Sequence, residues 1–174
     1  MDRDGVINER IRDGYVRTWD GFHFLPGVLD ALRSLAAWAP RIVVVTNQQG
    51  VGKRLMSVDA LEDIHRQMVS AVAQAGGRID AVHFCPHLAS EECACRKPLP
   101  GMATAYLDAH PDIDGSLSIM VGDTDSDIEM ARRLGAITGG CVAVRIDGAQ
   151  DPCADLTFIG LTEFAAAVDA ARRS

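Results

Sequence analysis

Residues 42–53, IVVVTNQQGVGK, carry the clearest indication of the fold. The first four are β-branched and apolar, which is typical of a short strand buried on both faces of a sheet. Polar residues follow at once, and residues 57–76 then show apolar side chains at helical spacing, with Ser57 suited to cap the helix. A strand, a polar loop and a helix in this order predict one unit of an α/β fold.

The same order recurs along the chain. We expect further strands at residues 79–84, 118–121, 141–146 and 156–159, and further helices at residues 26–38, 125–134 and 161–172. Gly135 is expected to end the helix at 125–134. The alternation predicts a three-layer, Rossmann-like parallel sheet with helices on both faces. Ligands of such sheets bind beyond the carboxyl ends of the strands, so we expect the chemistry in the loops that follow them.

Length and composition suit a single domain spanning residues 1–174, since 48% of the residues are hydrophobic and no repeat or linker divides the chain. Basic residues number 17 and acidic residues 24, for a net charge of −7. Such an excess disfavours nucleic-acid binding, which needs a basic face. The apolar runs are too short to cross a membrane and no targeting leader is visible, so we expect a cytoplasmic protein. The sequence shows no obvious stripe of residues that would form a subunit interface, so a monomer is the simplest expectation.

A cluster of metal-ligand residues lies at about 85–96. Cys85, His87, Cys93 and Cys95 offer three thiolates and one imidazole, the ligand set of a closed tetrahedral zinc site. A closed site leaves no position for a reactive water, so the predicted zinc is structural. Buried cysteines without a metal are the alternative interpretation.

Carboxylates gather at two of the predicted strand ends. Asp2 and Asp4 are two positions apart, so they point the same way in an extended segment. One can attack phosphorus while the other protonates the leaving oxygen, although the residues alone do not say which, and a solvated pair is the alternative. Asp123 follows the strand at 118–121 and suits a magnesium ligand, with Asp127 as an outer partner of the metal or of a lysine.

Two further polar segments have side chains that suit the binding of an anion. Thr46 and Asn47 place a hydroxyl and an amide at a strand end, where they suit a phosphate oxygen or form an ordinary polar turn. Lys97 could neutralise a phosphoryl group and Arg96 could grip a second anionic group, although such pairs are also common on surfaces.

Taken together and in order, these segments resemble the haloacid-dehalogenase superfamily of aspartate-nucleophile phosphatases over nearly the whole chain. The matching segments are DRDGVIN (2–8), GYV (14–16), FLPGV (24–28), VVVTNQQGVGK (43–53), CPH (85–87), CACRKPLPGM (93–102) and MVGDTDSDIEMA (120–131). Within the superfamily, the sequence is similar to the zinc-loop subfamily, which has little or no cap domain and includes phosphatases of heptose bisphosphate and of histidinol phosphate.

The resemblance implies a role for each matched residue. The implied catalytic residues are Asp2 as the nucleophile that forms an aspartyl-phosphate, Asp4 as general acid/base, Thr46 on a phosphoryl oxygen and Lys97 at the transition state. The implied magnesium ligands are the Asp2 side chain, the Asp4 backbone carbonyl and Asp123. The implied substrate contacts are Asn47 and Arg96, and the implied zinc ligands are Cys85, His87, Cys93 and Cys95.

The expected function is magnesium-dependent hydrolysis of a small phosphorylated metabolite. Matching segments such as GYV and FLPGV favour heptose 1,7-bisphosphate as the substrate, whereas the short gap between His87 and Cys93 favours histidinol phosphate. The count of matching segments puts the heptose bisphosphate first. A zinc-stabilised binding module that has lost catalysis is the alternative from another class of protein.

Two features depart from the subfamily. Thr124 stands where relatives usually carry lysine or arginine, so one positive charge near the phosphate is missing. Relatives also have an apolar strand that leads into the nucleophile, of which only Met1 is present. We therefore expect a gap in the sheet that deprives neighbouring strands of ladder partners, and a misplaced or truncated start is our interpretation.

Overall fold

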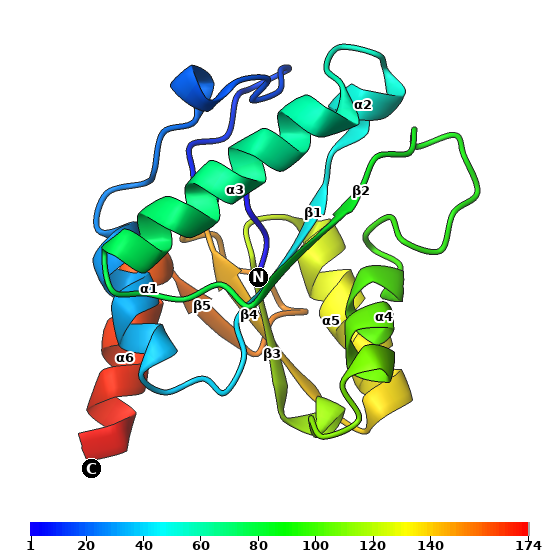
Figure 1. Cartoon of the computed structure of the whole chain (residues 1–174). Helices are drawn as coiled ribbons and strands as arrows, with labels where there is room; N and C mark the ends of the chain where they lie inside the picture. Colours follow the sequence, from blue (N-terminus) through cyan, green and yellow to red (C-terminus); the bar gives the residue numbers. More distant parts are fainter. Residues whose placement is uncertain (174) are drawn as a thin grey trace.

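The computed structural model describes residues 1–173, which form parallel strands between helical layers (Figure 1). The strands are β1 (Val43–Asn47), β2 (Ala81–Cys85), β3 (Ser118–Gly122), β4 (Cys141–Ile146) and β5 (Leu156–Phe158). The helices are α1 (Val28–Ala36), α2 (Gln49–Gly52), α3 (Val58–Gln74), α4 (Gly101–Ala109), α5 (Asp125–Thr138) and α6 (Leu161–Arg173). Two short 3-10 helices are η1 (Trp19–Gly21) and η2 (Gly115–Leu117).

All strand pairings are parallel, which confirms the predicted sheet. β1 pairs with β2, and β3, β4 and β5 pair in that order. Residues 1 and 2 bridge these two groups of strands. The Met1 nitrogen donates to the Val43 carbonyl oxygen (2.8 Å) and the Met1 carbonyl accepts from the Val45 N–H (2.9 Å), while the Asp2 N–H donates to the Val121 carbonyl oxygen (2.9 Å).

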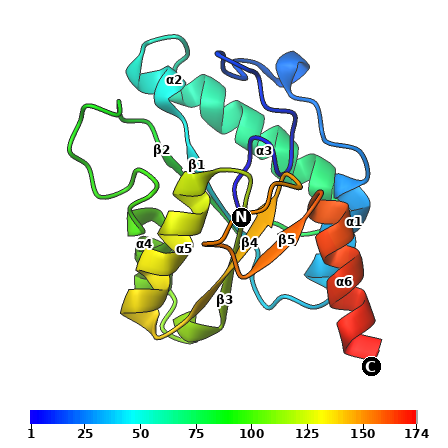
Figure 2. The ribbon, with the colours of Figure 1, turned by 180° about the vertical axis from the view of Figure 1, so that it is seen from behind.

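Successive strand residues face opposite helical layers, as the two-residue period of a strand requires. Val44 and Val121 join an apolar cluster that includes residues of α1, α3 and α6. Val45 and Met120 join a second cluster that includes residues of α4 and α5. Figures 1 and 2 show these two sets of helices on opposite sides of the strands, so the predicted three-layer fold is confirmed.

Helices α4 and α5 differ from the sequence-based expectation, and the four-residue α2 lies where a polar loop was expected. Gly135 does not end the helix, because α5 continues to Thr138 and is capped by Gly139, whose φ of 91° is left-handed. Gly135 instead allows close approach to the following strand, since a Cβ there would lie 3.1 Å from the backbone nitrogen of Cys141. Helix α4 was not predicted, because its buried residues Met102 and Tyr106 form no long apolar stripe.

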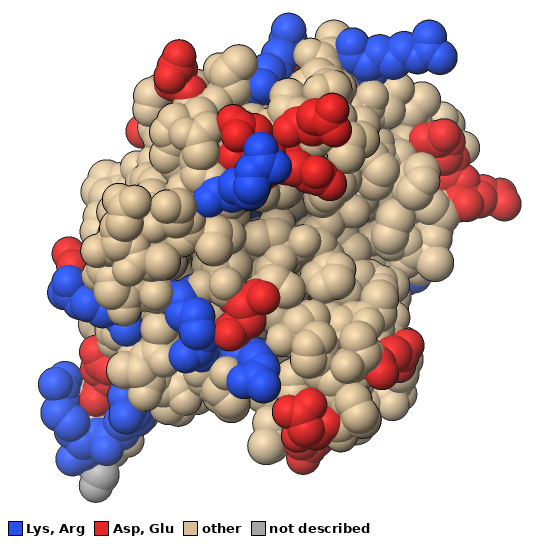
Figure 3. Space-filling model, in the orientation of Figure 1, with Lys and Arg blue, Asp and Glu red and all other residues tan. Residues whose placement is uncertain are grey.

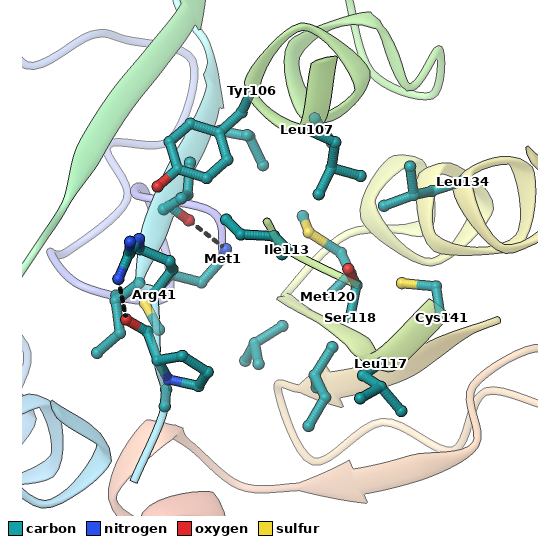
Figure 4. Close-up of a pocket in the computed structure, with 18 of the residues that line it drawn as sticks. Met1, Arg41, Tyr106, Leu107, Ile113, Leu117, Ser118, Met120, Leu134 and Cys141 are labelled. Atoms are coloured by element: carbon teal, nitrogen blue, oxygen red, sulfur yellow. Dashed lines mark hydrogen bonds between the residues drawn. The ribbon is translucent and has the colours of Figure 1, made fainter. Parts of the chain in front are cut away.

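A cavity of about 490 Å³ lies between β1 and β3 (Figure 4). It is lined by residues of both helical layers, with Leu35 of α1 and Phe164 of α6 from one layer and Tyr106 of α4 and Leu134 of α5 from the other. Among residues 1–173, the backbone that bridges the two strands is that of residues 1 and 2. The cavity therefore lies between the two groups of strands that residues 1 and 2 bridge.

Surface charges of both signs are interspersed on the face shown in Figure 3. Exposed ion pairs within one helix include Arg33 with Asp30 and Arg66 with Asp63. Exposed pairs contribute little stability, so the fold depends mainly on its apolar layers and strand pairing. In the part of the chain that the structure describes, we find no helix with both the length and the apolar character that a membrane crossing requires.

Candidate active site

The site-forming residues meet at one edge of the sheet, beyond the strand ends. Asp2 follows the bridging residue Met1, Thr46 lies near the end of β1, and Asp123 directly follows β3. Asp127 lies in the first turn of α5. The carboxyl ends of parallel strands are where α/β proteins bind ligands, and the structure brings the predicted residues to that place.

Lys97 lies between two buried carboxylates. Its Nζ is 2.7 Å from Asp2 Oδ1 and 2.6 Å from Asp127 Oδ1. Burial alone would lower the pKa of Lys97, but the two carboxylates outweigh it and raise that pKa above its usual value. Burial raises the pKa of Asp2, and the charge of Lys97 opposes that rise. The lysine therefore provides the positive charge that buried carboxylates need in order to stay ionised.

The loop that carries Lys97 is fixed by Asn47. The Asn47 Nδ2 donates to the Lys97 carbonyl oxygen (3.1 Å), and its Oδ1 accepts from the Lys97 N–H (3.0 Å). Both ends of the amide are thus engaged by the main chain of Lys97. Asn47, which the resemblance assigns to substrate, holds the lysine in position in this structure.

Three carboxylates crowd together beside Lys97. Oxygen atoms of Asp2, Asp123 and Asp127 lie within 4.8 Å of one another. Burial, followed by the charges of Asp2 and Asp127, raises the pKa of Asp123 to about 6, although Arg10 lies 3.2 Å away. Within residues 1–173, the buried Asp123 Oδ1 has no hydrogen-bond partner. Such a donor set fits a divalent cation such as Mg²⁺, which prefers carboxylate oxygens.

Gly5 leaves room for this carboxylate cluster. A Cβ at this position would lie 2.2 Å from Asp123 Oδ2, and the φ of 90° is left-handed. Both the space and the backbone conformation therefore require glycine.

Thr124 supports the lysine indirectly. Its hydroxyl donates to Asp127 Oδ2 (2.6 Å), and its N–H donates to the same oxygen (3.1 Å). The other carboxylate oxygen of Asp127 faces Lys97. A threonine in place of the subfamily's basic residue thus caps α5 and orients the carboxylate that pairs with Lys97.

Asp4 is held by several donors. Arg3 Nη2 donates to both carboxylate oxygens (2.9 and 3.0 Å), Asn8 Nδ2 donates to Oδ1 (2.9 Å) and Gln48 Nε2 donates to Oδ2 (2.8 Å). Burial alone would raise the pKa of Asp4, but Arg3 and these hydrogen bonds outweigh it and lower that pKa. Arg3 is completely buried and lies 3.1 Å from His65 Nε2.

Sequence reasoning missed Arg3, Asn8 and Gln48 as supporting residues. Each lies inside a segment that matches the superfamily, and its place in such a segment is the signal that could have identified it. An arginine beside two aspartates nevertheless suggests a solvated charge, and only tertiary packing buries it completely.

The four predicted zinc ligands converge. The Cys85 Sγ is 3.7 Å from Cys93 Sγ and 3.5 Å from His87 Nδ1, which is 3.2 Å from Cys95 Sγ. All three thiols are free of disulfides. Burial raises the pKa of the Cys85 thiol to about 12, so a thiolate there needs a cation beside it. The group can hold one metal ion.

Arg96 lies next to this cluster. Its Nη1 donates to the His87 carbonyl oxygen (3.4 Å). Together with Lys97 and residues of the cysteine loop, it lines an open cavity of about 510 Å³. Glu91 and Glu92 line the same cavity, so it presents charges of both signs.

Comparisons with known proteins show which family the chain resembles. A family model described as polynucleotide kinase 3 phosphatase matches residues 3–139. The D-glycero-alpha-D-manno-heptose-1,7-bisphosphate 7-phosphatase of Mycobacterium tuberculosis (strain ATCC 25618 / H37Rv) is 50% identical over 173 residues, which cover 99% of this chain and 91% of the relative. The D-glycero-beta-D-manno-heptose-1,7-bisphosphate 7-phosphatase of Bordetella bronchiseptica is 39% identical over 135 residues, covering 78% of this chain and 74% of the relative.

Solved structures give the same result. The D,D-heptose 1,7-bisphosphate phosphatase of B. bronchiseptica, crystallised with magnesium and phosphate, has a TM-score of 0.85 and 32% identity, covering 98% of this chain and 96% of that one. The enzyme of that name from Burkholderia thailandensis has a TM-score of 0.63 and 29% identity, and the match covers 97% of this chain and 96% of that one. This chain belongs to the haloacid-dehalogenase phosphatases, in the family that includes the D-glycero-D-manno-heptose-1,7-bisphosphate 7-phosphatases.

Proposed function

We propose that the protein hydrolyses the 7-phosphate of D-glycero-D-manno-heptose 1,7-bisphosphate and prefers the α anomer. The observation that carries the proposal is the 50% identity, over 99% of the chain, to relatives named for the α anomer. Relatives named for the β anomer are 36–39% identical over 78% of the chain. The names of these relatives also favour an enzyme over an inactive zinc-stabilised module.

Asp4 is an ionised acceptor in the free protein, so in the proposed reaction it takes up a proton when substrate binds. Asp2 then attacks the 7-phosphorus, and Asp4 donates that proton to the departing sugar oxygen, which leaves an aspartyl-phosphate. Asp4 then takes a proton from a water that attacks the same phosphorus, which releases inorganic phosphate and restores Asp2. Oδ1 of Asp2 forms an ion pair with Lys97 Nζ (2.7 Å) and accepts from the Arg3 N–H (2.7 Å), so we assign Oδ2 as the attacking oxygen.

Charge neutralisation is the other requirement, because phosphoryl transfer needs positioning and positive charge more than covalent help. Lys97 already lies against the proposed nucleophile, and Thr46 offers a hydroxyl to a phosphoryl oxygen. Asp2, Asp123 and the Asp4 backbone carbonyl would hold Mg²⁺, which supplies further positive charge to the phosphate. Arg96, in the open cavity beside Lys97, is our candidate for a substrate contact.

We infer that Cys85, His87, Cys93 and Cys95 bind structural zinc. Thiolates at about 2.3 Å from a tetrahedral zinc lie about 3.8 Å apart, close to the 3.7 Å between Cys85 Sγ and Cys93 Sγ. Such a site would organise the loop that carries Arg96 and Lys97.

A comparison of three substrates tests the proposal. With Mg²⁺ present, we expect kcat/KM for the α-anomeric heptose bisphosphate to exceed that for the β anomer, and to exceed that for histidinol phosphate by at least about 10-fold. Phosphate release is measured by a colorimetric assay, with magnesium-free enzyme as the control. A higher kcat/KM for histidinol phosphate would overturn the substrate assignment, and a higher value for the β anomer would overturn the anomer preference.

A further inference from the structure

We propose that Gln48 is a positioning residue that sets the hydroxyl of Thr46 and the carboxylate of Asp4 with one amide group. The inference rests on the proposed phosphatase reaction, in which these two residues touch the phosphoryl group and move the proton. The evidence for the inference is independent of that reaction, because it consists of two hydrogen bonds from a single buried nitrogen.

Gln48 is firmly held between β1 and α2. Its N–H donates to the Cys85 carbonyl oxygen at the end of β2 (2.8 Å), and its own carbonyl accepts from the Val51 N–H (3.2 Å). The residue is 1% exposed. A side chain with a fixed backbone and no access to solvent has little freedom to leave its partners.

The two acceptors determine how the amide is oriented. Nε2 donates to Asp4 Oδ2 (2.8 Å) and to Thr46 Oγ1 (3.0 Å). A carboxylate only accepts hydrogen bonds, so the opposite amide orientation would place two oxygens against each other. Because Arg3 and Asn8 also donate to Asp4, the carboxylate is held as an acceptor, and the amide nitrogen must face it.

This orientation fixes the direction of the Thr46 hydroxyl proton. Since Thr46 Oγ1 accepts from Gln48, its own proton must point to another acceptor. A phosphoryl oxygen is such an acceptor, so Gln48 makes Thr46 a donor to substrate before substrate arrives. The same amide holds Asp4 at a fixed separation from this hydroxyl, which is the geometric precision that phosphoryl transfer requires.

Glutamine is the side chain that this arrangement requires. Glutamate has the same shape but no donor, so it would repel Asp4 and would accept the Thr46 proton that substrate needs. Asparagine is one methylene shorter. Methionine has a similar length and no donor, which makes it a suitable test substitution.

We expect Gln48→Met to lower kcat for the heptose bisphosphate by at least about 10-fold while KM changes by less than about threefold. Gln48→Glu should lower kcat further. The matched control is Gln67→Met on α3, where the exposed amide contacts Asp63, and this variant should keep the wild-type kcat. Circular dichroism and melting curves establish that each variant is folded.

A double-mutant cycle separates positioning from a structural role. In a Thr46→Val background, the loss of kcat caused by Gln48→Met should shrink by at least about threefold, because one of its two acceptors is gone. An equal loss in both backgrounds, or wild-type kcat in folded Gln48→Met, would overturn the inference alone. A wild-type protein that releases no phosphate would overturn the proposed function, and the inference with it.

Discussion

Asp2→Asn should lower phosphate release from the heptose bisphosphate by at least about 10³-fold, because an amide cannot form the aspartyl-phosphate. The substitution keeps the shape of the side chain. Lys97 retains its ion pair with Asp127 (2.6 Å), so we expect the variant to remain folded. Steady-state phosphate release measures the loss.

The control for this prediction is Asp63→Asn, which changes an exposed aspartate on α3 and should leave activity unchanged. The melting temperature of Asp2→Asn is recorded alongside, since relief of carboxylate crowding favours the folded state. Phosphatase activity that survives Asp2→Asn would refute Asp2 as the nucleophile.

Cys85→Ser should lower the melting temperature by about 10 °C or more, because the proposed structural zinc would supply several kcal/mol to the fold. Cys85 is fully buried at the end of β2, and its cluster anchors the loop that leads to Lys97. Treatment of the wild-type protein with a zinc chelator should lower the free energy of unfolding by more than it lowers the free energy of magnesium binding. Calorimetry and magnesium titration measure the two effects.

Cys153→Ser is the matched control, because Cys153 is exposed and lies outside the cluster. It should melt at the wild-type temperature. Unchanged melting of the wild-type protein after zinc removal, verified by elemental analysis, would contradict the structural role of zinc.

Most of the fold could be predicted because its parts are local. Val43, Val44 and Val45 indicate a strand by their side chains alone, and the alternation of strands and helices then implies parallel pairing. Helix α4 and the end of α5 could not be predicted in the same way. Gly135 carries a usual stop signal, but close packing against Cys141 and the cap at Gly139 determine where the helix ends.

The candidate site also has one part that the sequence predicts and another that it does not. The convergence of Cys85, His87, Cys93 and Cys95 was predictable because the four residues are close in sequence. The roles of Asp2 and Lys97 are implied by the resemblance and stay predictions. The contacts of Arg3 and Gln48 were not predictable, since buried polar side chains are defined by partners distant in the chain. Asn47 likewise lies in a matched segment, but only the tertiary structure shows that it holds Lys97.

Phosphorus NMR of the α-anomeric heptose 1,7-bisphosphate, incubated with the wild-type protein and Mg²⁺, tests the central claim most directly. The two phosphate groups give separate signals, so the spectrum reports which one is removed. We predict that the 7-phosphate signal disappears as inorganic phosphate grows, while the 1-phosphate signal persists. Loss of the 1-phosphate signal, or survival of both signals, would contradict the account.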